Sequence, residues 1–194
     1  MDFRDFIGIE RDLEIHGLQN SPLIQLKLDN AQEVLKAAMR YFVGESLRWL
    51  PEYDKVAEWL TDNQGRGLLL YGSNGVGKTI LCRKALPAIL LKYHRKVVVH
   101  YDYNDLNVKT DEILSRKMLA IDDFGNEEQG VIFGNRRWVL PEVMDQAEKK
   151  NNIVLLTTNL EAKQIVEKYG ARTFDRMLST TIRVEIKRIE SFRG

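Results

Sequence analysis

The sequence predicts an α/β fold, in which a mostly parallel sheet of five strands is flanked by helices. From Gly67 onward, short apolar runs alternate with amphipathic stretches, which is typical of strands joined by helices on both faces of a sheet. The first four runs are apolar almost throughout, as buried parallel strands are, whereas the fifth alternates like an edge strand. We therefore expect strands at residues 68–71, 97–99, 118–121, 153–156 and 182–186.

Helices are expected before the sheet and between its strands. Apolar side chains recur at helical spacing over residues 34–42, and Gly44 is placed to end that helix. Pro87 lacks an amide hydrogen and should kink or break the helix in which it lies. Residues 24–28 alternate weakly between apolar and polar, which is a faint strand signal. Further helical segments are expected at residues 52–60, 78–93, 111–116, 135–149 and 162–168.

Length and composition limit the class of protein. The 194 residues suit one domain, which we divide into a short N-terminal extension at residues 1–29, a possible partner-docking segment, and a core at residues 30–194. A net charge of +1 argues against a protein that coats DNA through bulk positive charge, but it permits a local basic surface. One cysteine and three histidines exclude an intrachain disulfide and are too few for a zinc site. Since no segment resembles a signal peptide or a membrane span, we expect a cytoplasmic protein without membrane contact.

Residues 72–79 match a phosphate-binding loop, with a predicted strand before them and a predicted helix after them. The glycines permit a tight turn that points backbone N–H groups and the helix N-terminus at an anion. Lys78 would bring a positive charge to the outer phosphates of ATP, and the Thr79 hydroxyl would bind Mg²⁺. The predicted cofactor-binding residues are Gly72, Ser73, Asn74, Gly75, Val76, Gly77, Lys78, Thr79 and Ile80.

The third predicted strand ends in two carboxylates, Asp122 and Asp123. Phosphoryl transfer needs a metal ion that neutralises charge and a positioned nucleophile. We expect Asp122 to hold Mg²⁺ through water and Asp123 to orient the attacking water. We also expect this strand to lie beside the strand that precedes the phosphate loop. A solvated Asp-Asp turn is the alternative explanation of the pair.

Three further polar residues are candidates for catalysis. Asn159 follows the fourth predicted strand and would help to place the attacking water, although asparagine also favours ordinary turns. Arg176 and Arg193 are candidates for stabilising the charge of phosphoryl transfer. Single arginines are usually solvated or paired with carboxylates, so the alternative for Arg176 is an ion pair with Asp175 or Glu167.

Together these motifs resemble the bacterial helicase loaders of the DnaC/DnaI type and the related IstB-like transposition ATPases, a branch of the AAA+ family. The resemblance covers roughly residues 30–194 and rests on residues 72–79, residues 119–123, Asn159, Arg176 and Arg193. It implies a P-loop NTPase fold with an AAA+ or RecA-like core and without a full C-terminal helical lid. It also implies that Asn159 is sensor 1, that Arg176 is a finger reaching a neighbouring subunit's ATP, and that Arg193 is sensor 2.

Two departures from the family pattern concern the partner and the rate of hydrolysis. Relatives carry a larger N-terminal module that docks on the helicase or recombinase, whereas residues 1–29 are all that precede the core here. The second acid is often Glu in AAA+ proteins, and Asp123 is one methylene shorter. We therefore expect slow ATP hydrolysis that is stimulated by DNA or by a partner.

The leading functional hypothesis is an oligomeric ATPase that loads a replicative helicase and holds single-stranded DNA in a ring, spiral or filament. Phe133, Arg136 and Arg137 are candidates for contacting that DNA, since aromatic rings stack on bases and arginines bind phosphates. The alternative for these three residues is a solvated loop.

Two other functions remain open from the sequence. The first is an IstB-like regulator of transposition that delivers double-stranded DNA to a transposase. The second, from another class, is a P-loop kinase of small molecules. A kinase is disfavoured because the sequence has no insertion of lid length and its third strand ends in paired acids.

Overall fold

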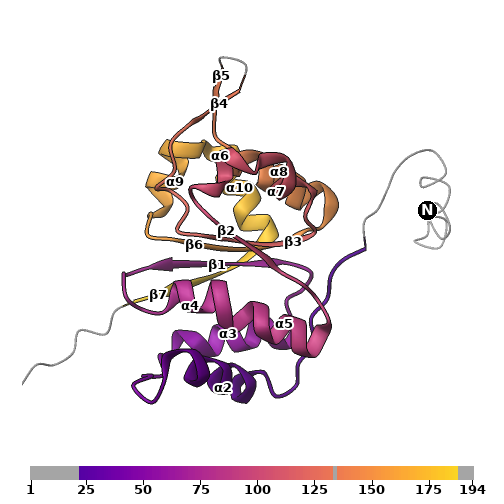
Figure 1. Ribbon diagram of the computed structural model, residues 1–194, viewed down its shortest axis with the longest axis vertical. Helices are drawn as coiled ribbons and strands as arrows, with labels where there is room; N and C mark the ends of the chain where they lie inside the picture. The colour runs from indigo at the N-terminus through magenta and orange to yellow at the C-terminus, as the bar shows by residue number, and fades with distance from the viewer. Residues whose placement is uncertain (1–21, 133–134, 188–194) are drawn as a thin grey trace, which may run out of the picture.

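The computed structural model describes residues 22–132 and 135–187 of the chain. Its main sheet has the strand order β2-β3-β6-β1-β7, and each neighbouring pair is parallel (Figure 1). The predicted α/β fold with a five-stranded parallel sheet is therefore confirmed, and the alternating strand β7 lies at an edge. The strands are β1 (Gly67–Gly72), β2 (Val99–Asp102), β3 (Met118–Asp122), β6 (Ile153–Thr158) and β7 (Thr181–Ile186).

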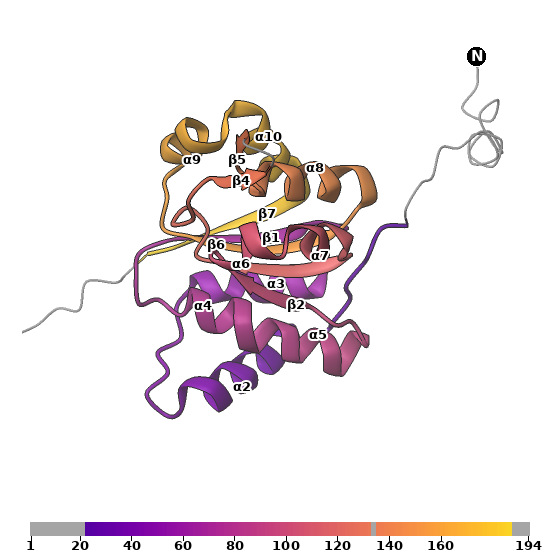
Figure 2. The same ribbon diagram turned by 45° about the horizontal axis from the view of Figure 1, so that its top comes forward.

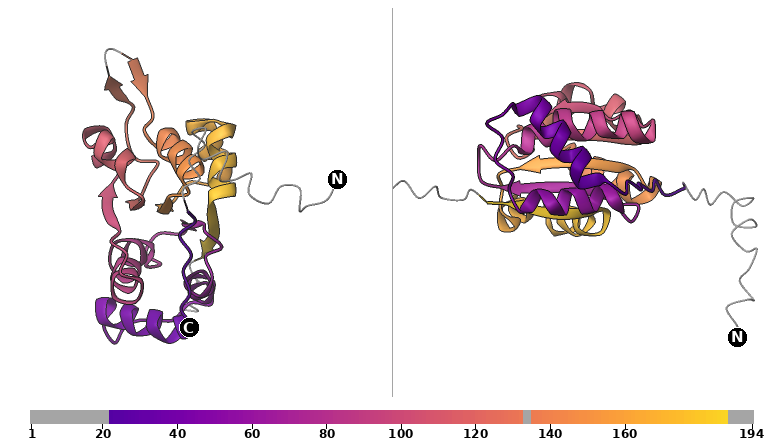
Figure 3. Two further views of the ribbon diagram at one scale, coloured as in Figure 1. Left: turned by 90° about the vertical axis from the view of Figure 1, so that its right-hand side faces the viewer. Right: turned by 90° about the horizontal axis from the view of Figure 1, so that it is seen from below.

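Helices cover both faces of this sheet (Figures 1 and 2). One face carries α2 (Ala31–Val43), α3 (Glu52–Thr61) and the continuous helical stretch α4 (Lys78–Ile80), η2 (Leu81–Ala85) and α5 (Leu86–His94). The other face carries α6 (Asp105–Val108), α7 (Thr110–Ser115), α8 (Leu140–Lys150), α9 (Ala162–Tyr169) and α10 (Ala171–Thr180). An antiparallel hairpin of β4 (Gly130–Ile132) and β5 (Asn135–Arg137) projects from this second layer (Figure 3).

The period of two along each strand divides the core between these layers. In β1, Leu68 and Leu70 pack in the cluster that includes α2, α3 and α5, whereas Leu69 packs in the cluster that includes α8 and α9. All three side chains are at most 2% exposed. Burying an aliphatic side chain of this size stabilises a fold by about 1.5–3 kcal/mol, so these near-continuous apolar strands anchor the loops at their ends.

The position of β3 differs from the prediction. We expected the strand that ends in Asp122 to lie beside β1, but β6 pairs with both β1 and β3 and separates them. The apolar character of β6 is equally compatible with either position, so the sequence pattern could not decide the order. The consequence is that residues 157–159 lie between the phosphate loop and the acidic pair.

Several element boundaries also differ from the predictions. The strand expected at residues 97–99 begins at Val99, and Val97 is 67% exposed. The helix expected at residues 135–149 begins only at Leu140, because residues 135–137 pair with β4 and Pro141 suits the first helical turn. Pro87 does not end its helix, because the π-helical turn of η2 precedes it and accommodates the missing hydrogen bond. Helix α10 was not predicted.

Residues 24–28 follow an extended course outside the sheet. The side chain of Asn63 takes the place of a neighbouring strand, since its Oδ1 accepts from Leu26 N at 2.8 Å and its Nδ2 donates to Ile24 O at 2.9 Å. Leu26 and Leu28 pack into the core from this segment. Core packing therefore includes residues before position 30, while the proposed division of the chain at that position remains a prediction.

Among residues 22–132 and 135–187, no helix has the length and apolar character needed to cross a membrane.

Candidate nucleotide-binding site

The candidate site lies where the C-terminal ends of β1, β3 and β6 meet. In a parallel sheet these ends share one edge, which is where ligands bind in open α/β folds. The phosphate loop leaves β1, Asp122 ends β3, and Asn159 follows β6. The fold thereby brings together Lys78, Asp123 and Asn159, which are widely separated in the sequence.

Three glycines give the phosphate loop its shape. Gly72, Gly75 and Gly77 have φ of 113°, 76° and 79°, in the region that other residues rarely adopt. A Cβ atom at Gly72 would lie 2.4 Å from Ile186 O, and one at Gly77 would lie 2.8 Å from the Tyr53 hydroxyl. The loop therefore requires glycine for its backbone angles and, at positions 72 and 77, also for space.

Lys78 is the buried cation of the site, with 7% of the residue exposed. Its Nζ donates to Gly72 O at 2.9 Å, to Ser73 O at 2.7 Å and to Asn159 Oδ1 at 2.9 Å. Burial lowers the pKa of Lys78, and the carboxylates of Asp123 and Asp122 oppose that shift. The ammonium group is thus held in place between the loop and the tip of β6.

Thr157 connects the Asp122 carboxylate to the backbone of Asp123. Its hydroxyl donates to Asp122 Oδ1 at 2.6 Å and accepts from Asp123 N at 2.7 Å. The Asp123 carboxylate is oriented on both oxygens, because Asn159 Nδ2 donates to Oδ1 at 2.9 Å and Asn126 Nδ2 donates to Oδ2 at 2.6 Å. Asp123 has φ of 57°, an uncommon backbone conformation that is found more often at functional sites.

A cavity of about 320 Å³ lies between these groups. Residues 74–80 line it together with Asp123, Thr157 and Asn159. Asp122 is only 4% exposed and lies behind Thr157, so Asp123 is the acid that faces the cavity.

The donor set of this cavity fits Mg²⁺, which takes oxygen ligands and is usually held by one or two carboxylates together with phosphates and water. Within the described part of the chain, no cluster of three or more His, Cys, Asp or Glu side chains is placed to hold a metal by itself. The hydroxyl of Thr79 and the nearby acids therefore suit a metal ion that arrives with a phosphate ligand.

A second cavity of about 460 Å³ adjoins the loop on the α2 and α3 side. It shares residues 75–77 and Ile80 with the first cavity, and Trp49 and Tyr53 contribute aromatic rings to its lining. The rings lie edge to face with centroids 5.2 Å apart, and the Tyr53 hydroxyl donates to Val76 O at 2.9 Å. An apolar, aromatic pocket beside a phosphate loop has the chemistry needed to hold a nucleotide base.

Sequence reasoning missed these aromatic residues and Thr157. Trp49 and Tyr53 lie well before the loop in the sequence and belong to no motif, so only their position in the fold reveals them. Thr157 lies at the end of β6, and its contacts with the Asp122 carboxylate and the Asp123 N–H depend on the placement of β6 beside β3.

The loop after β3 is fastened to α9 by a buried cluster. Glu127 is 6% exposed, accepts from Gly125 N at 2.6 Å and receives a hydrogen bond from the Tyr169 hydroxyl. Lys168 Nζ donates to Glu127 O at 2.9 Å and lies 4.4 Å from the centre of the Trp138 ring. The segment that carries Asp123 is therefore tied to the layer that also carries α10.

Arg176 is held by carboxylates on α8. Its NH2 lies 2.5 Å from Asp145 Oδ1 and its Nε lies 3.0 Å from Glu148 Oε2, and the side chain is only 13% exposed. These partners differ from Asp175 and Glu167, the two carboxylates suggested by the sequence. Its role as a finger stays a prediction, and that role would require the guanidinium to leave or share these carboxylates.

The other predicted residues cannot be placed. Arg193 and Phe133 lie outside the described residues. Arg136 and Arg137 belong to strand β5, for which the structure describes the backbone and not the side chains.

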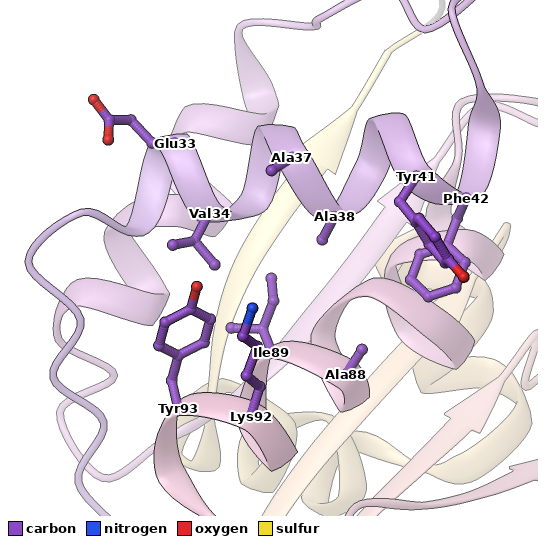
Figure 4. A pocket seen from close by; sticks show the side chains of 10 residues that line it. All are labelled: Glu33, Val34, Ala37, Ala38, Tyr41, Phe42, Ala88, Ile89, Lys92 and Tyr93. Atoms are coloured by element: carbon purple, nitrogen blue, oxygen red, sulfur yellow. The ribbon is translucent and has the colours of Figure 1, made fainter.

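A larger cavity of about 520 Å³ lies between α2 and α5 (Figure 4). Its lining is mostly apolar and includes Val34, Phe42 and Ile89. The phosphate loop and the two acids are not part of this lining, so the larger cavity is separate from the candidate nucleotide site.

The bridge through Thr157 yields a first prediction. Thr157→Val keeps the shape of the side chain but leaves the buried Asp122 oxygen and the Asp123 N–H without this partner, so we expect the protein to lose about 1–3 kcal/mol of unfolding free energy. We expect hydrolysis of ATP to fall further than ATP affinity, because Asp123 loses its support. Denaturant unfolding and phosphate release measure the two effects. Thr61→Val, which removes a hydrogen bond within α3, is the control, and equal losses of hydrolysis in both variants would contradict the assignment.

Comparison with models of known protein families finds no match to this sequence. Comparison with curated proteins also finds none.

Solved structures do match the fold. The crystal structure of the DnaC helicase loader superposes with a TM-score of 0.51 at 20% identity, covering 83% of this chain and 93% of that chain. The crystal structure of DnaI gives 0.50 at 20% identity, with coverage of 87% and 92%. AMPPCP-bound DnaA from Aquifex aeolicus gives 0.52 at 20% identity, with coverage of 73% of this chain and 49% of that chain. At these identities the likeness concerns the fold.

Proposed function

Because the chain has the AAA+ fold of the DnaC helicase loader, we propose that it is an oligomeric ATPase that acts on DNA in replication, most specifically as a helicase loader. The resemblance drawn from the sequence motifs is confirmed at the level of the fold. The observation that carries the proposal is the convergence of Lys78, Asp123 and Asn159 on one cavity that adjoins an aromatic pocket.

The two adjoining cavities support ATP as the ligand. Residues 75–77 line both, so a nucleotide lying across them would place its phosphates against the loop and its base beside Trp49 and Tyr53. Lys78 then exchanges its contact with the loop carbonyls and Asn159 for the outer phosphates, where a charged hydrogen bond is stronger than a neutral one. AMPPCP is bound in the DnaA structure of the same fold, which supports this class of ligand.

The arrangement of the acids supports hydrolysis. Mg²⁺, when bound with the nucleotide, would neutralise charge on the phosphates; the Thr79 hydroxyl would hold it directly and Asp122, behind Thr157, through water. Asp123 faces the cavity and can accept a hydrogen bond from a water molecule, while Asn159 and Asn126 fix its orientation. Asn159 contacts both Lys78 and Asp123, so it connects the phosphate-binding cation to the water-orienting acid.

Assembly and DNA binding complete the proposal. Arg176 of one copy would reach the nucleotide of the next, and Arg193 would act within its own copy. The projecting β4–β5 hairpin carries Arg136 and Arg137 and is the proposed contact for single-stranded DNA. We place the helicase-loader role ahead of the transposition role because the solved structures of similar fold include the DnaC helicase loader.

The experiment that tests the role is capture of a replicative helicase. Tagged protein with Mg²⁺ and ATP is mixed separately with a purified replicative helicase and a purified transposase from the same source. The proposal expects ATP-dependent retention of the helicase and DNA-stimulated phosphate release. Retention of the transposase in place of the helicase would overturn the loader assignment in favour of a transposition ATPase.

A further inference from the structure

Three lysines lie at the edge of the sheet opposite the nucleotide site. Lys96 follows α5, Lys117 precedes β3 and Lys150 ends α8, so three separate parts of the chain bring them to the N-terminal ends of the strands. Together with Gln25 and Asn151 they line a cavity of about 400 Å³. In Figure 1 the arrow of β1 points left, toward the phosphate loop, and the C-terminal end of α5 lies at the right.

Two carboxylates on the neighbouring helices α7 and α8 are engaged with other cations. Glu112 pairs with Arg116 at 2.8 Å, and Asp145 pairs with Lys149 at 2.7 Å. Within residues 22–132 and 135–187, Lys96, Lys117 and Lys150 form no ion pair, and all three are exposed. The three lysines therefore carry positive charges that no carboxylate in the described part of the protein pairs with, although the whole chain has a net charge of only +1.

Helix dipoles explain only part of this arrangement. Lys150 lies in the last turn of α8, where a cation is favourable, but Lys149 already occupies the same turn. The last turn of α5 likewise already holds Lys92. Lys117 begins no helix and ends none, so the convergence of the three lysines on one cavity is not a by-product of capping.

The lining of the cavity indicates the kind of ligand. Lysine is a point charge that binds phosphate without reading sequence, whereas proteins that hold single strands add aromatic rings on which bases stack. The residues that line this cavity include no aromatic side chain. A surface of this kind suits a nucleic-acid backbone whose bases are already stacked and paired.

We propose that the edge formed by Lys96, Lys117 and Lys150 binds the phosphate backbone of duplex DNA, separately from the hairpin. This inference rests on the proposed action on DNA and adds a duplex contact to it. Because the lysine edge and the nucleotide site lie at opposite ends of the strands, duplex binding here does not obstruct the phosphate loop. The protein could then hold a duplex at one edge while nucleotide binds at the other.

The test is the salt dependence of binding to a fluorescent 20-base-pair duplex. The variant carries Lys96→Gln, Lys117→Gln and Lys150→Gln, and the control carries Lys55→Gln, Lys109→Gln and Lys163→Gln, so both lose three positive charges. Three phosphate contacts contribute about 2.7 to the slope of log affinity against log salt concentration, at about 0.9 each. We expect the edge variant to lose about this much slope and the control to keep the wild-type slope.

The outcomes separate this inference from the proposed function. The duplex site would be overturned if the wild type and the edge variant had the same slope of log affinity against log salt concentration. It would also be overturned if the edge variant and the control lost the same amount of slope. Nucleotide binding is measured on the same preparations with a fluorescent ATP analogue. A wild type that binds the analogue but shows no lysine-dependent duplex slope overturns this inference only. A lysine-dependent slope without nucleotide binding overturns the proposed ATPase and leaves the duplex site supported.

Discussion

Asp123→Asn is expected to leave ATP affinity within about threefold of wild type while lowering the hydrolysis rate by about a hundredfold or more, the range for loss of a positioned acid or base. Asp123 faces the cavity and has an amide donor on each carboxylate oxygen. An asparagine presents one oxygen and one NH2 group, so it loses the negative charge and can satisfy only one of these two donors. Phosphate release and titration with a fluorescent ATP analogue separate the two effects.

The matched control for this substitution is Asp111→Asn, which changes an exposed carboxylate on α7 by the same atoms. We expect it to behave as wild type in both assays. Normal hydrolysis by folded Asp123→Asn would show that another group orients the attacking water. A large loss of ATP affinity would instead place Asp123 among the residues that bind the metal.

If Arg176 is a finger that reaches the ATP of a neighbouring subunit, Arg176→Ala is expected to lower the rate of ATP hydrolysis by about a thousandfold. ATP binding to a single subunit should stay nearly intact. The decisive experiment mixes this variant with Lys78→Ala. An Arg176→Ala subunit keeps an intact ATP site, and a Lys78→Ala subunit can supply it with an intact arginine. Recovery of phosphate release in the mixture is therefore expected, even though each variant is inactive by itself.

The ion pairs of Arg176 make a structural explanation testable as well. Removing the arginine leaves Asp145 and Glu148 on α8 without this partner, although Asp145 keeps Lys149. The double substitution Asp145→Asn with Glu148→Gln breaks the same contacts and spares the arginine. If it abolishes hydrolysis to the same extent, and if mixtures shown to assemble recover no activity, Arg176 is a structural link between α8 and α10 and not a finger.

The sequence was sufficient for the parts of the fold that repeat a local pattern. The apolar runs at residues 68–71, 118–121 and 153–156 are strands, because a strand buried on both faces shows its burial in its own residues. The turn at residues 72–79 was also predictable, because its glycines mark the positions that need positive φ. Three of them adopt positive φ in the structure, and two have no room for a side chain. These features depend on neighbours along the chain, which is why they could be predicted.

The predictions that were wrong concern features that depend on contacts between distant segments. Strand β6 lies between β1 and β3, but the residues of β1 and β3 do not indicate which strand is their neighbour. The order of these strands was therefore predicted wrongly. Asn63 substitutes for a strand partner 37 residues away, and residues 135–137 pair with β4 where helical periodicity was expected. In the site, the aromatic pocket and the Thr157 bridge were invisible for the same reason.

Energy transfer from tryptophan to a fluorescent ATP analogue in the presence of Mg²⁺ shows directly whether the loop holds a nucleotide. Trp49 lines the cavity beside the loop, so we expect a saturable signal that unlabelled ATP displaces and that Trp49→Phe strongly reduces. Lys78→Ala removes the buried cation and should weaken binding tenfold or more, whereas Lys84→Ala, an exposed lysine of the same helical stretch, should not. An unchanged titration in a folded Lys78→Ala protein would contradict the account, because the loop would then not be the nucleotide site.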